Sequence, residues 1–235
     1  MESCSFQLEV CVDRIDEAVA AASAGATRIE FNQALKLDGL TPALSSCSWL
    51  SDHVEVPVIA MVRPHNDGFH YTDGEKRCML HDVEAMLSTG IRGVAIGAFA
   101  DGKSTHPSLD FEFLQSVCEL SGDREVVLHR VFDGLDDAQQ ISSLETLRQI
   151  GVCRILTSGG RKTAAEGMQQ LARLVEAAPD GLEILAGSGV NASVLEQLYH
   201  QARIEQFHGS FTLGSGILQA REVAMARRIL LGLAP

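Results

Sequence analysis

The chain has 235 residues, 46% of them hydrophobic, so it is long enough to bury one large core. Its formal net charge of −12 argues against nucleic acid and anionic membrane surfaces as partners, because both would repel it. The opening residues lack the basic start and apolar run of a signal peptide, and no stretch approaches the roughly 20 apolar residues of a membrane span. The six cysteines show no C-x-x-C spacing, which is typical of reduced thiols. We therefore expect a soluble, cytoplasmic protein.

Short runs rich in β-branched residues alternate with amphipathic segments along the whole chain. Helical periodicity occupies segments such as 15–25, 75–90 and 163–178. Gly25, Gly90 and Gly151 stand where such helices would end. The expected strands are residues 7–12, 27–32, 57–62, 93–99, 125–131, 154–159, 182–188 and 204–210.

Apolar strands that alternate with helices favour a parallel sheet, because parallel strands are buried on both faces. Eight repeats predict that the sheet closes into a single (β/α)8 TIM barrel, forming one domain over residues 1–235. An open doubly wound sheet is the alternative that the same alternation allows. For the assembly we expect a homodimer, because exposed apolar barrel helices often pair.

Polar residues gather at the predicted strand ends, which is where barrels carry their active sites. Residues i and i+2 of a strand share one face, so Glu9 points with Cys11, Glu30 with Asn32, and His208 with Ser210. An unpaired carboxylate packed against the helices would be unfavourable, so the barrel interior or its mouth is favoured. The other strand ends deliver Arg63, His129, Arg130, Asp133, Ser158, Gly159, Gly187 and Gly189 to the same mouth.

Each of these residues also has a purely structural interpretation. Glu9 and Glu30 can be acids that form salt bridges with Arg63 or Arg130 inside the barrel. His129 can be a satisfied core histidine on an apolar strand, and Arg63 can simply brace the loop that follows it.

Two other polar groups leave similar alternatives. Asp133 can be the N-cap of the following helix instead of a ligand-binding residue. His65, Asp67 and His70 share one loop and resemble a metal patch, although exposed loop histidines are usually just solvated.

Two glycine-rich turns, residues 156–167 and 185–198, each connect a strand end to a helix start. Backbone N–H groups at such turns attract anions, and barrel loops after the seventh and eighth strands often hold a phosphate. Glycine is also needed there for backbone geometry alone. Asn191, in the second turn, is interpreted as an N-cap.

A set of short motifs, in order along the chain, resembles the CutC copper homeostasis family. The motifs are LEVC (8–11), RIE (28–30), GLTP (39–42), VRP (62–64), the Phe69–Tyr71 loop, HRVFD (129–133), LTSGG (156–160), AGSGV (186–190) and FHGS (207–210). The resemblance covers nearly the whole chain, and the segment after Ser210 differs from the usual tail.

The resemblance implies a cytoplasmic TIM barrel that controls copper homeostasis and binds copper(I) through cysteine. Cu(I) is a soft ion and prefers thiolate and thioether ligands. The family's first cysteine is kept as Cys11, whereas its second falls on Asn32, whose amide is a poor Cu(I) ligand. Asp38 replaces the first glycine of the family's G-G-L-T-P loop, and residues 65–68 depart from its R-P-R-G-G-D-F loop. A two-thiolate site therefore cannot form at these positions.

Two hypotheses follow. The first is copper(I) binding through Cys11 with a methionine such as Met61. The second is an enzyme that acts on a small anionic or sugar-like substrate. Its catalytic acid–base groups would be Glu9, Glu30, His129 and His208, and Arg63 would orient the substrate.

Overall fold

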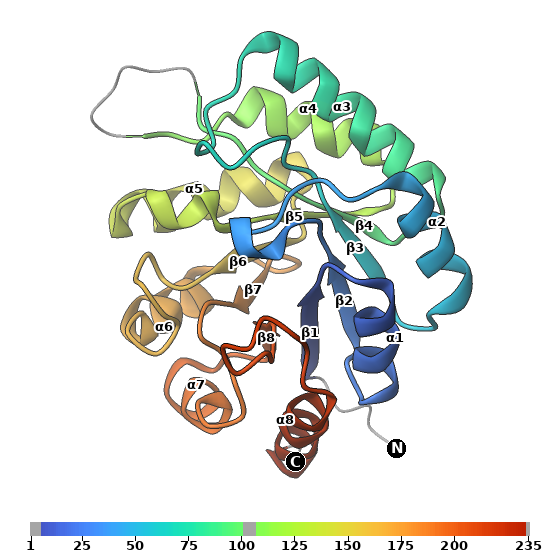
Figure 1. Ribbon diagram of the computed structural model, residues 1–235. Helices are drawn as coiled ribbons and strands as arrows, with labels where there is room; N and C mark the ends of the chain where they lie inside the picture. The colour runs from blue at the N-terminus through green and yellow to red at the C-terminus, as the bar shows by residue number, and fades with distance from the viewer. Residues whose placement is uncertain (1–5, 101–106, 234–235) are drawn as a thin grey trace.

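A computed structural model of the chain describes residues 6–100 and 107–233. Within these ranges, parallel strands form a closed barrel in sequence order, and Figure 1 shows the helices arranged around it. The strands are β1 (Gln7–Val12), β2 (Arg28–Phe31), β3 (Val58–Met61), β4 (Gly93–Ile96), β5 (Glu125–Leu128), β6 (Arg154–Thr157), β7 (Glu183–Ala186) and β8 (Gln206–Gly209). The helices are α1 (Ile15–Ser23), α2 (Leu44–His53), α3 (Asp73–Ser88), α4 (Phe111–Ser121), α5 (Asp137–Ile150), α6 (Met168–Ala177), α7 (Leu195–Ala202) and α8 (Ala220–Leu233).

Pairing between the first and last strands closes the barrel. Glu9 on β1 lies opposite His208 on β8, and Cys11 lies opposite Glu30 on β2. The predicted TIM barrel is therefore confirmed, and the open doubly wound alternative is wrong.

Local sequence signals account for the helix ends. Capping boxes begin α3 at Thr72 and α5 at Asp136, where side chain and backbone satisfy each other's hydrogen bonds. Gly25, Gly90 and Gly151 have φ of 104°, 91° and 107°, a left-handed conformation that stops a helix. The predicted helix ends at these glycines are confirmed.

Several strands are shorter than the sequence indicates. The strand expected over 125–131 ends at Leu128, and a 3₁₀ helix, η2 (Arg130–Gly134), follows it. His129 is the N-cap of η2, because its Nδ1 accepts a hydrogen bond from the N–H of Val131 at 3.2 Å. His129 and Arg130 therefore lie just beyond β5 and not on it.

Alternation along each strand divides the buried residues into two sets. On β1, Leu8, Val10 and Val12 belong to the large core between the strands and the helices. A small apolar cluster lies inside the barrel and consists of Ile59, Met61, Ala95, Val127, Leu156 and Leu185. Glu9 and Cys11 share the inward face of β1, as predicted.

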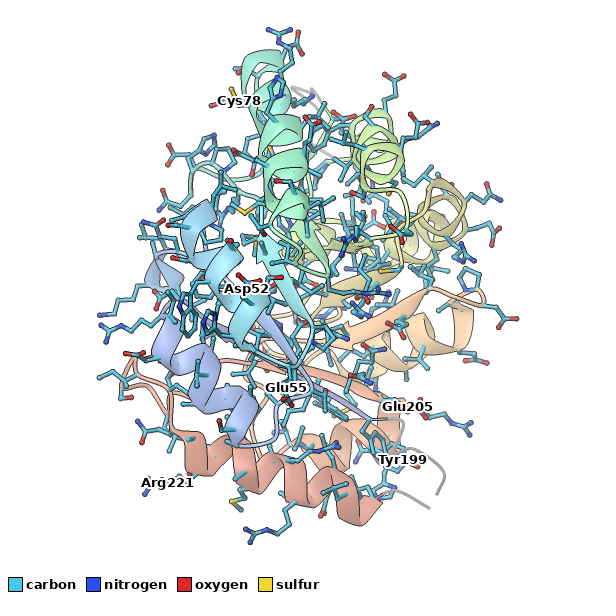
Figure 2. The ribbon with its side chains drawn as sticks, turned by 90° about the vertical axis from the view of Figure 1, so that its right-hand side faces the viewer. Asp52, Glu55, Cys78, Tyr199, Glu205 and Arg221 are labelled. Carbon is cyan, nitrogen blue, oxygen red and sulfur yellow. The ribbon has the colours of Figure 1, made fainter. Side chains whose placement is uncertain are left out.

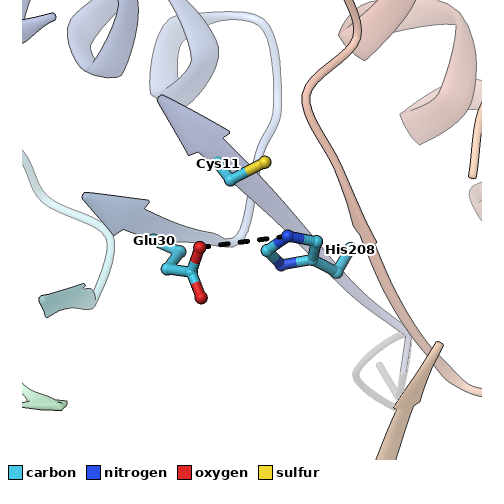
Figure 3. Close-up of side chains that lie close together, drawn as sticks. All are labelled: Cys11, Glu30 and His208. Carbon is cyan, nitrogen blue, oxygen red and sulfur yellow. Dashed lines mark ion pairs between the residues drawn. The ribbon is translucent and has the colours of Figure 1, made fainter. Parts of the chain in front are cut away.

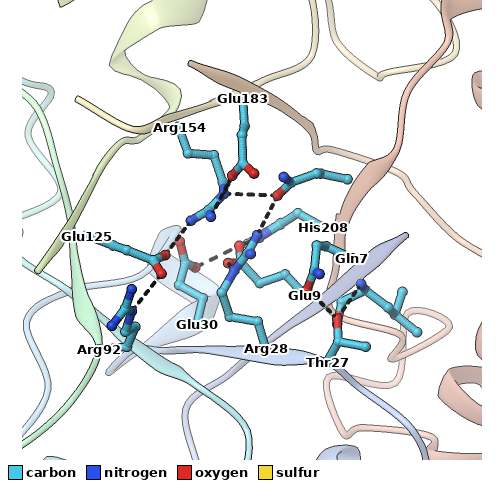
Figure 4. A network of polar contacts seen from close by, with 12 residues as sticks. Gln7, Glu9, Thr27, Arg28, Glu30, Arg92, Glu125, Arg154, Glu183 and His208 are labelled. Atoms are coloured by element: carbon cyan, nitrogen blue, oxygen red, sulfur yellow. Dashed lines mark hydrogen bonds and ion pairs between the residues drawn. The ribbon is translucent and has the colours of Figure 1, made fainter. Parts of the chain in front are cut away.

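A layer of paired charges also fills the barrel interior (Figure 4). Arg28 forms an ion pair with Glu9 and donates to Gln206 at 3.0 Å. Arg154 pairs with Glu125 at 2.9 Å and Glu183 at 2.6 Å, and it also donates to Gln206 at 2.9 Å. The expected partner of Glu9 was Arg63 or Arg130, and that expectation is wrong because Arg28 already occupies its carboxylate.

The outer helices carry exposed side chains, and Figure 2 labels Asp52 on α2, Cys78 on α3 and Arg221 on α8. No helix in the described ranges combines the length and apolar character that a bilayer-spanning segment needs.

Candidate functional site

A cavity of about 1200 Å³ opens at the carboxyl ends of the strands, where TIM barrels carry their sites. Nine of the predicted residues line it: Cys11, Glu30, Asn32, Arg63, His129, Arg130, Gly189, His208 and Ser210. Five do not: Glu9, Asp133, Ser158, Gly159 and Gly187. The loop after β2 and the segment 212–217 after β8 also line the cavity, and the sequence analysis did not include them.

Three potential metal ligands meet at this mouth (Figure 3). The Cys11 sulfur, a Glu30 oxygen and a His208 ring nitrogen all lie within 4.8 Å of one another. All three residues are buried, with exposures of 7%, 3% and 8%. They lie on β1, β2 and β8. Because β1 pairs with both β2 and β8, closure of the barrel brings the three residues together. In the described residues this is the one cluster of this kind.

Glu9 determines how the imidazole of His208 faces the cluster. The Nδ1 atom of His208 lies 2.7 Å from Glu9 Oε1, and its Nε2 lies 3.9 Å from Glu30 Oε2. A carboxylate that holds one ring nitrogen fixes the orientation of the other, as it does for many metal-binding histidines. Glu9 was predicted as a catalytic residue, and its position behind His208 makes it a support for the site.

The buried charges of this group shift one another's pKa values. Burial would raise the pKa of Glu9, but Arg28 and His208 outweigh it, so this pKa lies well below its usual range. Burial raises the pKa of Glu30, and the nearby Glu9 adds to this effect. Burial would lower the pKa of His208, but Cys11, Glu30 and Glu9 raise it well above its usual value. The cluster therefore combines a carboxylate and an imidazole in strong mutual interaction.

Asn32 follows β2 beside this cluster. Its Nδ2 donates to Glu30 Oε2 at 3.0 Å, so Asn32 orients the carboxylate of Glu30. Its Oδ1 faces Gly39, where a Cβ would lie only 2.3 Å away, and it has no hydrogen-bond partner among the described residues. Gly39 has a φ of 81°, so both its conformation and its lack of a side chain are needed here.

Arg63 and His129 form a second polar group in the wall of the cavity. Arg63 Nη1 donates to the carbonyls of Leu37, Asp38 and Gly39 at 3.4, 3.3 and 3.5 Å. Burial and the charge of Arg63 lower the pKa of His129 to about 3, so its imidazole is neutral near pH 7. Neither Arg63 Nε nor His129 Nε2 has a hydrogen-bond partner in the described chain.

Asp133 organises the loop after β6 and lies outside the cavity. Its carboxylate accepts from Thr157 Oγ1 at 2.6 Å and from the backbone N–H groups of Ser158 and Gly160 at 3.0 and 3.1 Å. It also pairs with Arg130 at 2.8 Å. The N-cap interpretation of Asp133 is wrong, because Asp136 caps the following helix.

The predicted glycine turns serve packing more than ligand contact. A Cβ at Gly159 would lie 2.7 Å from the carbonyl oxygen of Gly167, and one at Gly187 would lie 2.5 Å from Leu156. Only Gly189 of these predicted glycines lines the cavity. Asn191 accepts from the N–H of Ser193 at 2.9 Å and so begins the turn before α7, whose N-cap is Val194.

The loop histidines do not form a metal patch. His65 pairs with Glu75 at 3.3 Å, and the His70 ring packs near Phe99 with 5.2 Å between centroids. Among the described residues, no metal-ligand cluster includes His65, Asp67 or His70.

Arg28, Arg154 and Gln206 also point into the barrel and were not predicted from the sequence. Each begins a strand and precedes an inward-facing residue by two positions, as Arg28 precedes Glu30 and Gln206 precedes His208. The same period-2 rule could therefore have placed them inside the barrel.

A model of the CutC family matches residues 6–213. The chain belongs to the CutC family. A CutC family protein of Vibrio campbellii is 35% identical over 204 residues, which cover 86% of this chain and 80% of that protein. The copper homeostasis protein cutC homolog of Drosophila melanogaster is 33% identical over 211 residues, which cover 89% of this chain and 79% of that protein. The resemblance seen in the sequence motifs is thereby confirmed.

Solved structures agree with the fold of this CutC family member. The CutC crystal structure from Streptococcus agalactiae matches with a TM-score of 0.81 and 24% identity, over 87% of this chain and 98% of that one. The phosphoribosyl anthranilate isomerase of Thermotoga maritima matches with a TM-score of 0.64 and 10% identity, over 97% and 99% of the two chains. At these identities, the two matches bear on the barrel architecture alone.

Proposed function

We propose that this CutC family protein takes part in copper homeostasis by binding a copper ion at Cys11, Glu30 and His208. The observation that carries the proposal is the convergence of a sulfur, a nitrogen and an oxygen ligand within 4.8 Å at the barrel mouth. Family membership and the copper homeostasis name of the Drosophila relative support the same assignment.

The chemistry of the donor set fits copper. Thiolate is the preferred ligand of Cu(I), and imidazole also suits copper. Met61 lines the same cavity and offers a further sulfur, whereas Asn32 is already bonded to Glu30. We place the protein in the cytoplasm, where thiols such as Cys11 stay reduced.

A competition titration tests this proposal. Reduced full-length protein is titrated with Cu(I) against a chromophoric chelator, and Cys11→Ala and His208→Ala are each expected to lose about tenfold or more in affinity. Cys78→Ala is the matched control, because this thiol is exposed on the outer surface of α3 (Figure 2). Unchanged affinity in Cys11→Ala, or tighter binding of Zn²⁺ than of copper, would contradict the proposal.

Acid–base catalysis on a small anionic or sugar-like substrate is the second candidate. The observation that favours it is the raised pKa of Glu30, caused mainly by burial, which makes its carboxylate a stronger base than that of an exposed glutamate. Neutral His129 would then serve as a hydrogen-bond donor. Turnover of a sugar-phosphate library by the wild type, abolished in Glu30→Gln, is the expected result; no turnover by the wild type would reject this candidate.

A further inference from the structure

Three arginines are buried in the described part of the chain, and they differ in how their charge is balanced. Arg28 pairs with Glu9, and Arg154 pairs with Glu125 and Glu183. Arg63 is only 5% exposed, yet within the described residues no carboxylate lies at ion-pairing distance from it. A buried charge without a counter-charge is unfavourable, so this arginine calls for an explanation.

The Arg63 side chain is held firmly in the wall of the cavity. Three backbone carbonyls accept from its Nη1, and its guanidinium lies over the Phe69 ring at 4.8 Å from the centroid. These neutral partners fix its position without cancelling its charge. Its Nε–H group is left without any hydrogen-bond acceptor in the described chain.

His129 provides a second unused donor in the same wall. Its Nδ1 accepts from the N–H of Val131, so the ring proton of the neutral imidazole sits on Nε2. That Nε2–H has no partner in the described chain. The Phe69 ring packs against His129 as well, with 4.8 Å between centroids, so one aromatic ring contacts both donor side chains.

The nearby carboxylate of Glu30 is not available to balance Arg63. It accepts from Asn32 at 3.0 Å and faces His208 Nε2 at 3.9 Å. The acidic side chains of the cavity rim, such as Asp38, form no ion pair with Arg63 within the described residues. An anionic molecule that enters the cavity would supply the missing counter-charge.

We propose that Arg63 and His129 form a binding site for the oxyanion group of a small molecule, either a carboxylate or a phosphate ester. A guanidinium is shaped to bind such groups through parallel N–H donors, and a neutral imidazole adds one more N–H without adding charge. Ser188, Ser210 and Thr212 line the same cavity with hydroxyl groups that suit the polar remainder of the molecule. The proposal uses none of the three metal ligands and so stands apart from the copper assignment.

Calorimetric titration of metal-free full-length protein tests this site. Inorganic phosphate and malonate are used as separate titrants at fixed ionic strength, with glycerol as the neutral comparison. We expect saturable binding of at least one anion, and the tighter of the two identifies the oxyanion class. Arg63→Gln is expected to weaken binding about tenfold or more, the loss typical of a charge-assisted hydrogen bond.

Two further variants sharpen the result. His129→Asn keeps an acceptor for the N–H of Val131 but removes the Nε2–H donor, so it should weaken anion binding while the fold is retained. Arg161→Gln is the matched control, because Arg161 is exposed, pairs with Asp137 and does not line the cavity. Its affinity should equal that of the wild type.

Two outcomes would overturn the proposal. In the first, the wild type binds neither anion saturably; in the second, Arg63→Gln binds the anion as tightly as the wild type does. If Arg63→Gln does not fold, as judged by its melting curve, Arg63→Lys and His129→Asn give the same comparison. Cu(I) affinity is measured separately on the wild type, so failure of this site and failure of the copper site are distinguishable.

Discussion

Glu9 and His208 show how one buried carboxylate can serve a site that it does not line. Glu9 neutralises Arg28 on one side and bonds to Nδ1 of His208 on the other. The imidazole is thereby turned with Nε2 toward Glu30. At the scale of single residues, the site therefore depends on side chains such as Glu9 that do not line the cavity but hold the residues that do.

Glu9→Gln is expected to affect both stability and copper binding. Loss of the carboxylate leaves Arg28 buried and unpaired, which should cost about 3–5 kcal/mol in the free energy of unfolding. Loss of the anchor for His208 should weaken copper binding about 10- to 100-fold. Urea denaturation and Cu(I) competition measure the two effects.

Glu183→Gln is the matched control, because Glu183 also pairs with a buried arginine, Arg154, but does not contact His208. It should lower stability and leave copper affinity unchanged. Equal copper affinity in Glu9→Gln and the wild type would show that Glu9 has no role in positioning the imidazole.

His129 predicts a specific pH dependence of stability. Its pKa is lowered to about 3 in the folded protein by burial and by Arg63, the charged group that faces it, against an ordinary value of 6.5. Between these values the unfolded chain binds a proton that the folded chain does not. This histidine therefore makes the protein less stable as the pH falls below 6.5, by up to about 1.4 kcal/mol per pH unit.

His129→Asn removes this titration, so its unfolding free energy should fall less steeply than that of the wild type between pH 6.5 and 4.5. Urea denaturation across that range measures the difference. Parallel pH profiles for the two proteins would mean that His129 is protonated in the folded state.

At the scale of the elements, the loop after β2 joins the two polar groups of the mouth. Carbonyls of Leu37, Asp38 and Gly39 accept from Arg63, and Gly39 packs against Asn32, which in turn orients Glu30. This loop therefore supports both the proposed copper ligand and the proposed anion site.

Gly39→Ala is expected to destabilise the protein more than Gly68→Ala. Both glycines have positive φ, 81° and 87°, so each alanine bears a similar backbone cost of about 1 kcal/mol. Only at Gly39 would the new Cβ meet another residue, Asn32 Oδ1 at 2.3 Å, because nothing lies within 4 Å of a Cβ at Gly68. Denaturation of the two variants gives the comparison; equal losses would show that Asn32 moves aside freely.

Repeat count and alternation were sufficient to predict the barrel and the inward direction of Glu9, Cys11 and Glu30, because strand periodicity is a local property. They did not reveal where β5 stops, since the bond from Val131 to His129 that begins η2 depends on a turn. Nor did they identify the partners of Glu9 and Asp133, because Arg28 and the loop after β6 approach them only in the folded barrel. For the same reason, the sequence could not give the distances among the side chains of Cys11, Glu30 and His208.

At the scale of the whole molecule, closure of the barrel creates the candidate copper site. His208 and Glu9 are 199 positions apart in the chain, yet β1 and β8 are hydrogen-bonded neighbours. An ion held by Cys11, Glu30 and His208 would connect the first two strands with the last one.

Copper should therefore raise the melting temperature of the whole protein cooperatively. A ligand that binds only the folded state adds about 2.7 kcal/mol of stability at a hundredfold excess over its Kd. The shift should be clearly smaller in Cys11→Ala and of full size in Cys78→Ala, as followed by thermal denaturation under reducing conditions. A shift of full size in Cys11→Ala would place the ion elsewhere.

The order of the three candidate ligands along the chain also bears on when the proposed copper site can form. Cys11 and Glu30 precede His208 by most of the barrel, so they are synthesised before β8. A growing chain carries an incomplete set of ligands until its final strand has joined the first. Copper bound as proposed would therefore find its full set of ligands only after β8 has paired with β1.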